Sequence, residues 1–158
     1  MKKSETTKQE KKSMTKIEAR TLYGIIRRLD AKGIDSATRS KMLAATIATK
    51  KCAQELEEAE KTVNESATEK EREADRTVSE LRRKLAADKS YVPSDKENEA
   101  VAVMAEWKRT ADNSLKEIFE ADAAINLKKL TDDELDSLAG NNSLSFDELA
   151  LMKQLLVE

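Results

Sequence analysis

The fold is decided by residues 36–87, which read SATRSKMLAATIATKKCAQELEEAEKTVNESATEKEREADRTVSELRRKLAA, with no Gly and no Pro. Ala, Glu, Lys, Leu and Arg dominate this stretch, a composition typical of long helices. Apolar residues recur in it at a spacing of eleven, in the two series Leu56, Ala67, Val78 and Val63, Ala74, Leu85. Eleven residues in three turns is close to the period of an unstrained helix. The stretch therefore predicts one nearly straight helix from 36 to 87, whose narrow apolar stripe needs a partner helix.

The partner helix is predicted directly downstream. Pro93, followed by the capping-box pair Ser94 and Glu97, is typical of a helix start. The apolar stripe of this helix comprises Val101, Met104, Trp107, Ala111, Leu115, Ile118 and Ile125, and we expect the helix to run to about Lys129. Because the connection is short, the two helices should be antiparallel neighbours, with Leu56 facing Ile125. The two helices thus predict a long antiparallel hairpin that forms a coiled-coil-like stalk.

Further helices are predicted at both chain ends. Three more capping boxes are present, namely Thr15 with Glu18, Thr131 with Glu134, and Ser145 with Glu148. Gly33 is expected to end the first helical segment by permitting a left-handed turn. These end helices are the only ones left to cover Met42, Leu43 and Ile47 on the long helix. The fold class is therefore expected to be all-α, with a small helical head built from both chain ends.

The expected organisation has four segments. They are a flexible basic arm at residues 1–14, the first helix and the start of the long helix at 15–52, the helical hairpin at 53–129, and two short acidic helices at 130–158. The arm lacks apolar periodicity, so it cannot bury enough surface to offset the entropy of ordering it.

Charge is distributed unevenly along the chain. Residues 1–52 carry fourteen Lys and Arg against five acids, a net charge of +9, whereas residues 53–158 carry −11. The basic third could face an external partner or dock on the acidic C-terminal end of the chain. The residues predicted to bind a partner are Lys2, Lys3, Lys8, Lys11, Lys12, Arg20, Arg27, Arg28, Lys32 and Arg39.

The sequence argues against several kinds of chemistry. It holds no His, and Cys52 is its only cysteine, so imidazole catalysis, an intrachain disulfide and a thiolate zinc cluster are excluded. Cys52 lies on the apolar stripe and is expected to be a buried small hydrophobe. No catalytic, cofactor or metal site is predicted. The longest apolar run, 100–105, is far too short to span a membrane, and we expect a cytoplasmic protein.

The predicted function is that of a non-enzymatic interaction, scaffolding or assembly protein that works through protein–protein contacts or self-association. The alternative is a nucleic-acid-binding accessory protein that uses the basic N-terminal third. Tyr23 is the only aromatic residue in that third, so a surface on which bases stack is not expected. A titration of the chain with nucleic acid at several salt concentrations separates the two hypotheses.

Overall fold

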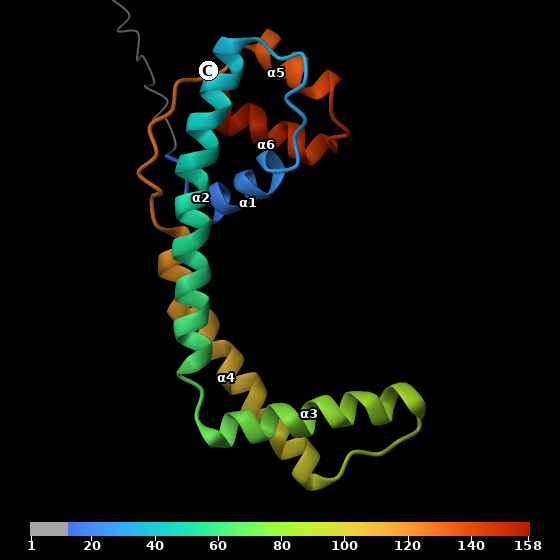
Figure 1. Ribbon diagram of the computed structural model, residues 1–158. Coiled ribbons are helices and arrows are strands. Elements are labelled where there is room, and N and C mark those ends of the chain that lie inside the picture. Colours follow the sequence, from blue (N-terminus) through green and yellow to red (C-terminus); the bar gives the residue numbers. More distant parts are fainter. Residues whose placement is uncertain (1–12) are drawn as a thin grey trace, which may run out of the picture. The chain divides into compact units, whose positions relative to one another are not determined.

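The computed structural model describes residues 13–158, and these residues confirm the predicted all-α class (Figure 1). The helices are α1 (Lys16–Ile26), α2 (Ser36–Glu65), α3 (Glu69–Ala87), α4 (Asp95–Glu120), α5 (Asp132–Gly140) and α6 (Phe146–Leu156). No strand occurs between residues 13 and 158; only two isolated β-bridges are present, Thr15 with Asp122 and Leu130 with Val157.

The described residues group into two compact units. Unit 1 contains residues 13–53 and 121–158, and unit 2 contains residues 54–120. The predicted arm at residues 1–14 falls almost wholly outside the described residues. Met14, its last residue, is buried in unit 1.

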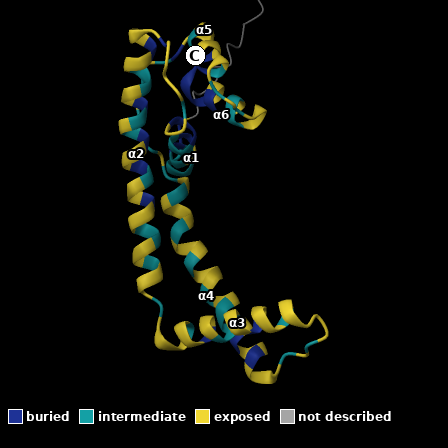
Figure 2. Ribbon diagram, turned by 45° about the vertical axis from the view of Figure 1, so that its right-hand side comes forward, coloured by how far each residue is buried: buried dark blue, intermediate teal, exposed yellow. Residues whose placement is uncertain are grey.

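Unit 1 has a closed apolar core to which both segments of the chain contribute. Its buried residues, dark blue in Figure 2, are Met14, Ala19, Leu22, Ile25, Ile26, Ile34, Ala45, Cys52, Leu130, Leu135, Leu138, Met152, Leu155, Leu156 and Val157. The expected burial of Cys52 is confirmed, since only 4% of it is exposed. Four residues of α1 belong to this core, because Ala19, Leu22, Ile25 and Ile26 share one face of the helix.

The predicted capping boxes are confirmed. In the boxes of α1, α5 and α6, the first residue accepts a hydrogen bond from the backbone N–H three residues on, and the glutamate there accepts one in return. Ser94 and Glu97 exchange the same two bonds at the start of α4, at 3.1 and 3.2 Å. Gly33 has φ +77°, the left-handed conformation expected of it.

The prediction of one continuous helix over residues 36–87 is wrong. The chain leaves the helix at residues 66–68, and α3 starts after a fifth capping box, in which Thr68 and Glu71 bond each other. The hydroxyl of Ser66 donates to the Val63 carbonyl at 2.6 Å, which occupies an oxygen that a continuing helix would use. The hydrogen bonds that the Ser66 and Thr68 side chains make thus end the helix here, although the apolar periodicity favours its continuation.

The prediction that the partner helix runs to Lys129 is also wrong, because α4 ends at Glu120. Residues 121–129 are extended apart from Ala124, which has φ +52°, and their exposure alternates from one residue to the next. Ala123, Ile125 and Leu127 pack against the core of unit 1. Backbone bonds hold both ends of this segment: the Ala123 N–H donates to Met14 at 2.8 Å, and the Leu130 N–H donates to Leu156 at 2.7 Å. Ile125 therefore lies outside any helix, and the helical pairing with Leu56 does not extend to it.

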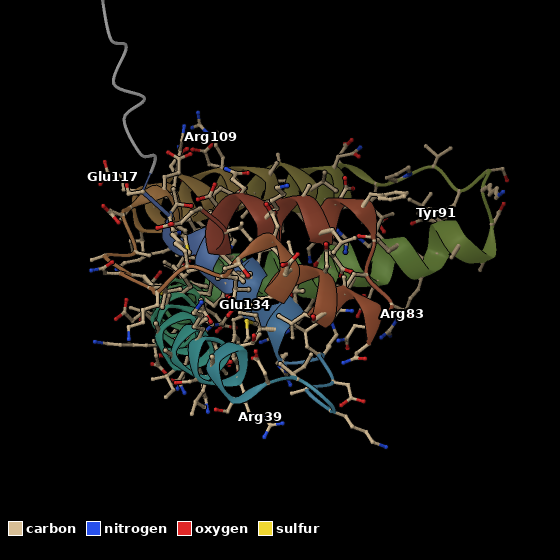
Figure 3. All side chains as sticks on the ribbon, turned by 90° about the horizontal axis from the view of Figure 1, so that it is seen from above. Arg39, Arg83, Tyr91, Arg109, Glu117 and Glu134 are labelled. Atoms are coloured by element: carbon tan, nitrogen blue, oxygen red, sulfur yellow. The ribbon has the colours of Figure 1, made fainter. Side chains whose placement is uncertain are left out.

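Unit 2 is built around the packing of α3 against α4. The turn that joins these helices is organised by Glu97, which is only 7% exposed. Its carboxylate accepts hydrogen bonds from the Tyr91 hydroxyl at 2.6 Å and from the Lys84 ammonium at 3.2 Å (Tyr91 is labelled in Figure 3). The bond from Tyr91, then that from the Ser94 backbone, lowers the pKa of Glu97 to about 2.

Candidate functional site

The basic residues predicted to bind a partner fall into two groups. Lys2, Lys3, Lys8, Lys11 and Lys12 lie outside the described residues. Arg20, Arg27, Arg28, Lys32 and Arg39 all lie in unit 1, on α1, on the following loop and on the first turn of α2. The predicted partner residues that the structure describes therefore all belong to unit 1.

Some of these cations are engaged within unit 1. Arg28 forms an ion pair with Glu148 at the start of α6, and its Nε also donates to the Gly24 carbonyl at 3.1 Å. The hydrogen bond from the Ser145 backbone, followed by that from Arg28, lowers the pKa of Glu148. Arg27 lies over the ring of Tyr23, 5.8 Å from its centroid. The N-terminal third thus contacts the acidic C-terminal helices at this point, as one of the two sequence interpretations proposed.

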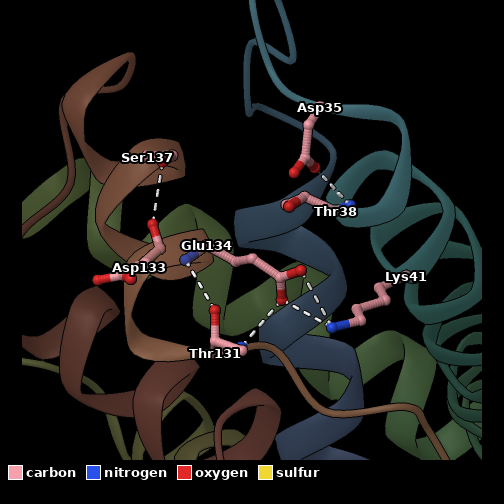
Figure 4. Close-up of polar contacts among 7 residues, drawn as sticks. All are labelled: Asp35, Thr38, Lys41, Thr131, Asp133, Glu134 and Ser137. Carbon is pink, nitrogen blue, oxygen red and sulfur yellow. Dashed lines mark hydrogen bonds and ion pairs between the residues drawn. The ribbon is translucent and has the colours of Figure 1, made fainter.

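A second contact between the basic and acidic regions involves Lys41, which was not among the predicted residues. Its ammonium donates to both carboxylate oxygens of Glu134, at 2.8 and 3.1 Å (Figure 4). Both side chains are largely buried, with 22% and 16% exposed. The bond from Lys41, then that from the Thr131 backbone, lowers the pKa of Glu134. The pair joins α2 to α5 within unit 1.

The loop between α1 and α2 is held by two asparagines that follow α5. The Asn142 Oδ1 accepts from the Asp30 N–H at 2.7 Å, and its Nδ2 donates to the carbonyls of Asp30, at 3.2 Å, and Leu138, at 2.8 Å. The Asn141 Nδ2 donates to the Lys32 carbonyl at 2.8 Å. Because these bonds are made to backbone atoms, they fix the path of the loop whatever its side chains are.

Unit 1 also contains an apolar groove of about 200 Å³. The residues that line it are Ile26, Leu29, Ala31, Ile34, Arg39, Met42, Leu43, Thr46 and Leu138. Arg39, labelled in Figure 3, is one of the two polar lining residues and lies at the N-terminal end of α2. Its Nη2 donates to the Ile34 carbonyl at 3.1 Å. We refer to this feature as the partner groove.

The partner groove continues onto an exposed apolar strip of α2. Leu43 is 61% exposed and Ile47 is 64% exposed, and their spacing of four residues places them on one face of the helix. The expectation that the end helices cover these two residues is therefore wrong. The segment 121–129 takes the place of the last part of the predicted partner helix, and α6 packs on α1 and on α5. An apolar strip of this kind, bordered by polar residues, is typical of an interaction site.

The two sides of the partner groove differ in charge. Residues 27–51 carry seven Lys and Arg against two Asp, a net charge of +5. Arg28 and Lys41 are paired with acids of the C-terminal helices, whereas Arg27, Lys32, Arg39, Lys50 and Lys51 are all exposed. The helix α5, which contributes Leu138 to the groove, carries four acidic residues. An acidic partner is therefore favoured electrostatically only along the side that residues 27–51 form.

The lining of the partner groove is largely apolar. Its volume is below the roughly 300 Å³ at which small-molecule sites begin. Arg39 and Thr46 are its only polar lining residues, and neither is a general base at neutral pH. Among residues 13–158, no three His, Cys, Asp or Glu side chains gather as metal ligands would. Within the same residues, no helix has the length and apolar character that crossing a membrane requires.

Comparison with known proteins does not assign a function. The chain matches no known protein family, no curated protein and no solved structure. The function is therefore inferred from the geometry of unit 1 and of unit 2.

Proposed function

We propose that this chain is a non-enzymatic interaction protein, with a scaffolding or assembly role, and that its partner groove binds an acidic amphipathic helix of another protein. The observation that carries the proposal is the exposure of Leu43 and Ile47, each more than 60%, beside an apolar groove lined mainly by the basic segment 27–51. Leaving these side chains in water forgoes the hydrophobic free energy of burying them. A partner helix with apolar residues at a spacing of three and four would recover it.

The same surface supports a protein partner better than nucleic acid. Nucleic-acid binding draws its affinity mainly from Lys and Arg contacts to phosphates, and it does not need a strip of Leu and Ile. Arg28 and Lys41 are already paired with acids of the same chain, and Tyr23 lies beneath Arg27. The buried thiol of Cys52 is compatible with the reducing cytoplasm in which we propose the protein works.

The proposal is tested with labelled synthetic helices and fluorescence anisotropy. The probes are peptides of about 18 residues that carry Leu at helical spacing and Glu at the flanking positions, with matched peptides in which Lys replaces Glu. We expect the acidic peptides to bind and the basic ones to fail. The variants Leu43→Asp and Ile47→Asp should each weaken acidic-peptide binding by at least about tenfold.

A matched control is Val92→Asp, which introduces the same kind of charge in unit 2 at a valine that is 82% exposed. It should leave peptide binding unchanged. Labelled duplex and single-stranded nucleic acid are titrated in parallel at physiological salt, and no binding is expected. The proposal is wrong if nucleic acid binds and the acidic peptides do not, or if Leu43→Asp and Val92→Asp have the same effect on peptide binding.

A further inference from the structure

Unit 2 presents an apolar seam along α4. Six of its residues follow each other at spacings of three, four, three, four and three, namely Val101, Met104, Lys108, Ala111, Leu115 and Ile118. This is the a/d pattern of a coiled coil, in which such positions are normally enclosed. None of the six is buried: Val101 is 43% exposed, Ile118 is 37% exposed, and Met104, Ala111 and Leu115 are half-buried.

The seam is open because unit 2 encloses few side chains of its own. Its buried hydrophobic residues are Leu56, Ala74, Leu81 and Ala100, two of which are alanines. Alanine contributes little apolar area, so the core of unit 2 gains little from the hydrophobic effect. Trp107, the single tryptophan of the chain, remains only half-buried.

A groove of about 560 Å³ runs beside the seam. It is lined by Val101, Met104, Trp107, Ala111 and Leu115 of α4, with Val78 of α3 opposite. Charged residues of both signs also line it: Glu60, Asp75 and Asp112 are acidic, whereas Arg82 and Lys108 are basic. The groove is therefore apolar along its length and has mixed charge, so a surface with the same mixture of charges complements it.

We propose that the occupant of this groove is a second copy of the chain, with the α4 helices of the two copies antiparallel. The seam has the same spacing in either direction, so a two-fold axis brings it onto itself. Val101 of one copy then faces Ile118 of the other, Met104 faces Leu115, and Lys108 faces Ala111. In this register each large apolar residue of the seam faces another large apolar residue. Lys108, the one charged residue of the seam, faces Ala111, the smallest.

Charge specifies the direction of this pairing. A parallel dimer would place Lys108 against Lys108, and like charges in close contact are strongly unfavourable. In the antiparallel dimer, Lys108 lies beside Ala111 and reaches the neighbouring Asp112 of the other copy. The two-fold axis makes this contact twice. A polar residue at a single seam position is a known way to fix the orientation of a coiled coil.

This proposal concerns unit 2 and is independent of the partner groove in unit 1. Its test uses the full-length chain in analytical ultracentrifugation between roughly 1 and 200 μM. We expect a reversible monomer–dimer equilibrium. The emission of Trp107 should shift to shorter wavelength over the same concentrations, because dimerisation excludes water from the groove that Trp107 lines.

Two charge variants make the test specific. Lys108→Glu alone places Glu beside Asp112 of the other copy, and Asp112→Lys alone places Lys beside Lys108. Each should raise the dissociation constant of its own dimer by at least about tenfold. A mixture of the two variants makes both contacts with opposite charges, so it should form a heterodimer of nearly wild-type affinity. Lys108 and Asp112 are also four residues apart on one helix, so each single variant changes a contact within one copy. Only the mixture of the two variants distinguishes the contact between copies from this contact within a copy.

Circular dichroism of each variant first confirms that the helical content is unchanged. The proposal is overturned if the wild-type chain stays monomeric across this range. It is equally overturned if both single variants dimerise as the wild type does, or if their mixture fails to restore dimerisation.

Discussion

Because Leu22 lies in the core of unit 1, the loss of unfolding free energy on its truncation to alanine can be predicted. Leu22 has no exposed surface, whereas Leu43, in the same unit, is 61% exposed. Truncation of a buried leucine to alanine removes about three carbon groups, each worth about 0.8 kcal/mol when buried. The cavity left behind adds to this loss, so Leu22→Ala should lower the free energy of unfolding by about 3 kcal/mol, within the observed range of about 2–5 kcal/mol. Leu43→Ala should lower it by less than about 1 kcal/mol, because most of that side chain is already in water.

Urea denaturation followed by far-ultraviolet circular dichroism measures this difference. Trp107 lies in unit 2, so its fluorescence, recorded in the same samples, reports unit 2 separately. The loss caused by Leu22→Ala should be found in the dichroism transition. Equal losses for the two variants, or a loss below about 1 kcal/mol for Leu22→Ala, would contradict the core described for unit 1.

Three further predictions concern polar and backbone features. Asn142→Ala should cost about 1–2 kcal/mol in urea denaturation, because it removes the bonds that Asn142 makes to Asp30 and Leu138. Asn142→Asp keeps the acceptor for the Asp30 N–H but sets a carboxylate oxygen against the carbonyls of Asp30 and Leu138, so it should cost at least as much. Ala124 has φ +52°, so Ala124→Gly should raise the melting temperature slightly, by the equivalent of about 0.5 kcal/mol, and Ala124→Val should lower it. The pKa of Glu97 lies below its ordinary value of 4.5, so its contribution to stability is complete above that pH and is lost as the pH falls toward about 2. Glu97→Gln should therefore lower the melting temperature near neutral pH, and it should flatten the dependence on pH below 4.5 when melting is followed through Trp107.

Local signals in the sequence predicted where helices begin. A Ser or Thr followed three residues later by Glu satisfies backbone groups within one turn, so its geometry does not depend on the rest of the fold. The starts of α1, α4, α5 and α6 were predicted on this basis. The break before α3 has the same signal in Thr68 and Glu71, but it lies within an apolar stripe of helical period, which favoured continuity.

The extended segment after α4 could not be predicted from helix propensity. Ala121, Ala123 and Ala124 favour a helix, yet Ala123, Ile125 and Leu127 also alternate with a period of two, as an extended chain requires. Backbone bonds to Met14 and Leu156 decide between the two, and both partners are distant in sequence.

The candidate site was only partly predictable for the same reason. Arg39 was predicted as a partner residue from its charge, and it does line the groove. The solvent exposure of Leu43 and Ile47 depends on where the extended segment and the C-terminal helices pack. No local pattern contains that information.

The division of unit 1 between residues 13–53 and 121–158 has a consequence for synthesis. As the chain leaves the ribosome, all of unit 2 emerges before α5 and α6, and domains tend to fold as units while they emerge. Until Met152 and Leu155 arrive, Leu22 and its neighbours on α1 lack the helix that covers them. If unit 2 has already folded, the two parts of unit 1 are joined by a folded connection between Cys52 and Ala123 instead of a long flexible loop. The entropy cost of bringing the two parts together is then smaller. In the finished protein the Cys52 Sγ lies 4.0 Å from the Ala123 carbonyl oxygen, so the two ends of the interrupted unit meet where unit 2 leaves and returns. The apolar face of α1 therefore stays partly uncovered in the newly made chain until α6 has been synthesised.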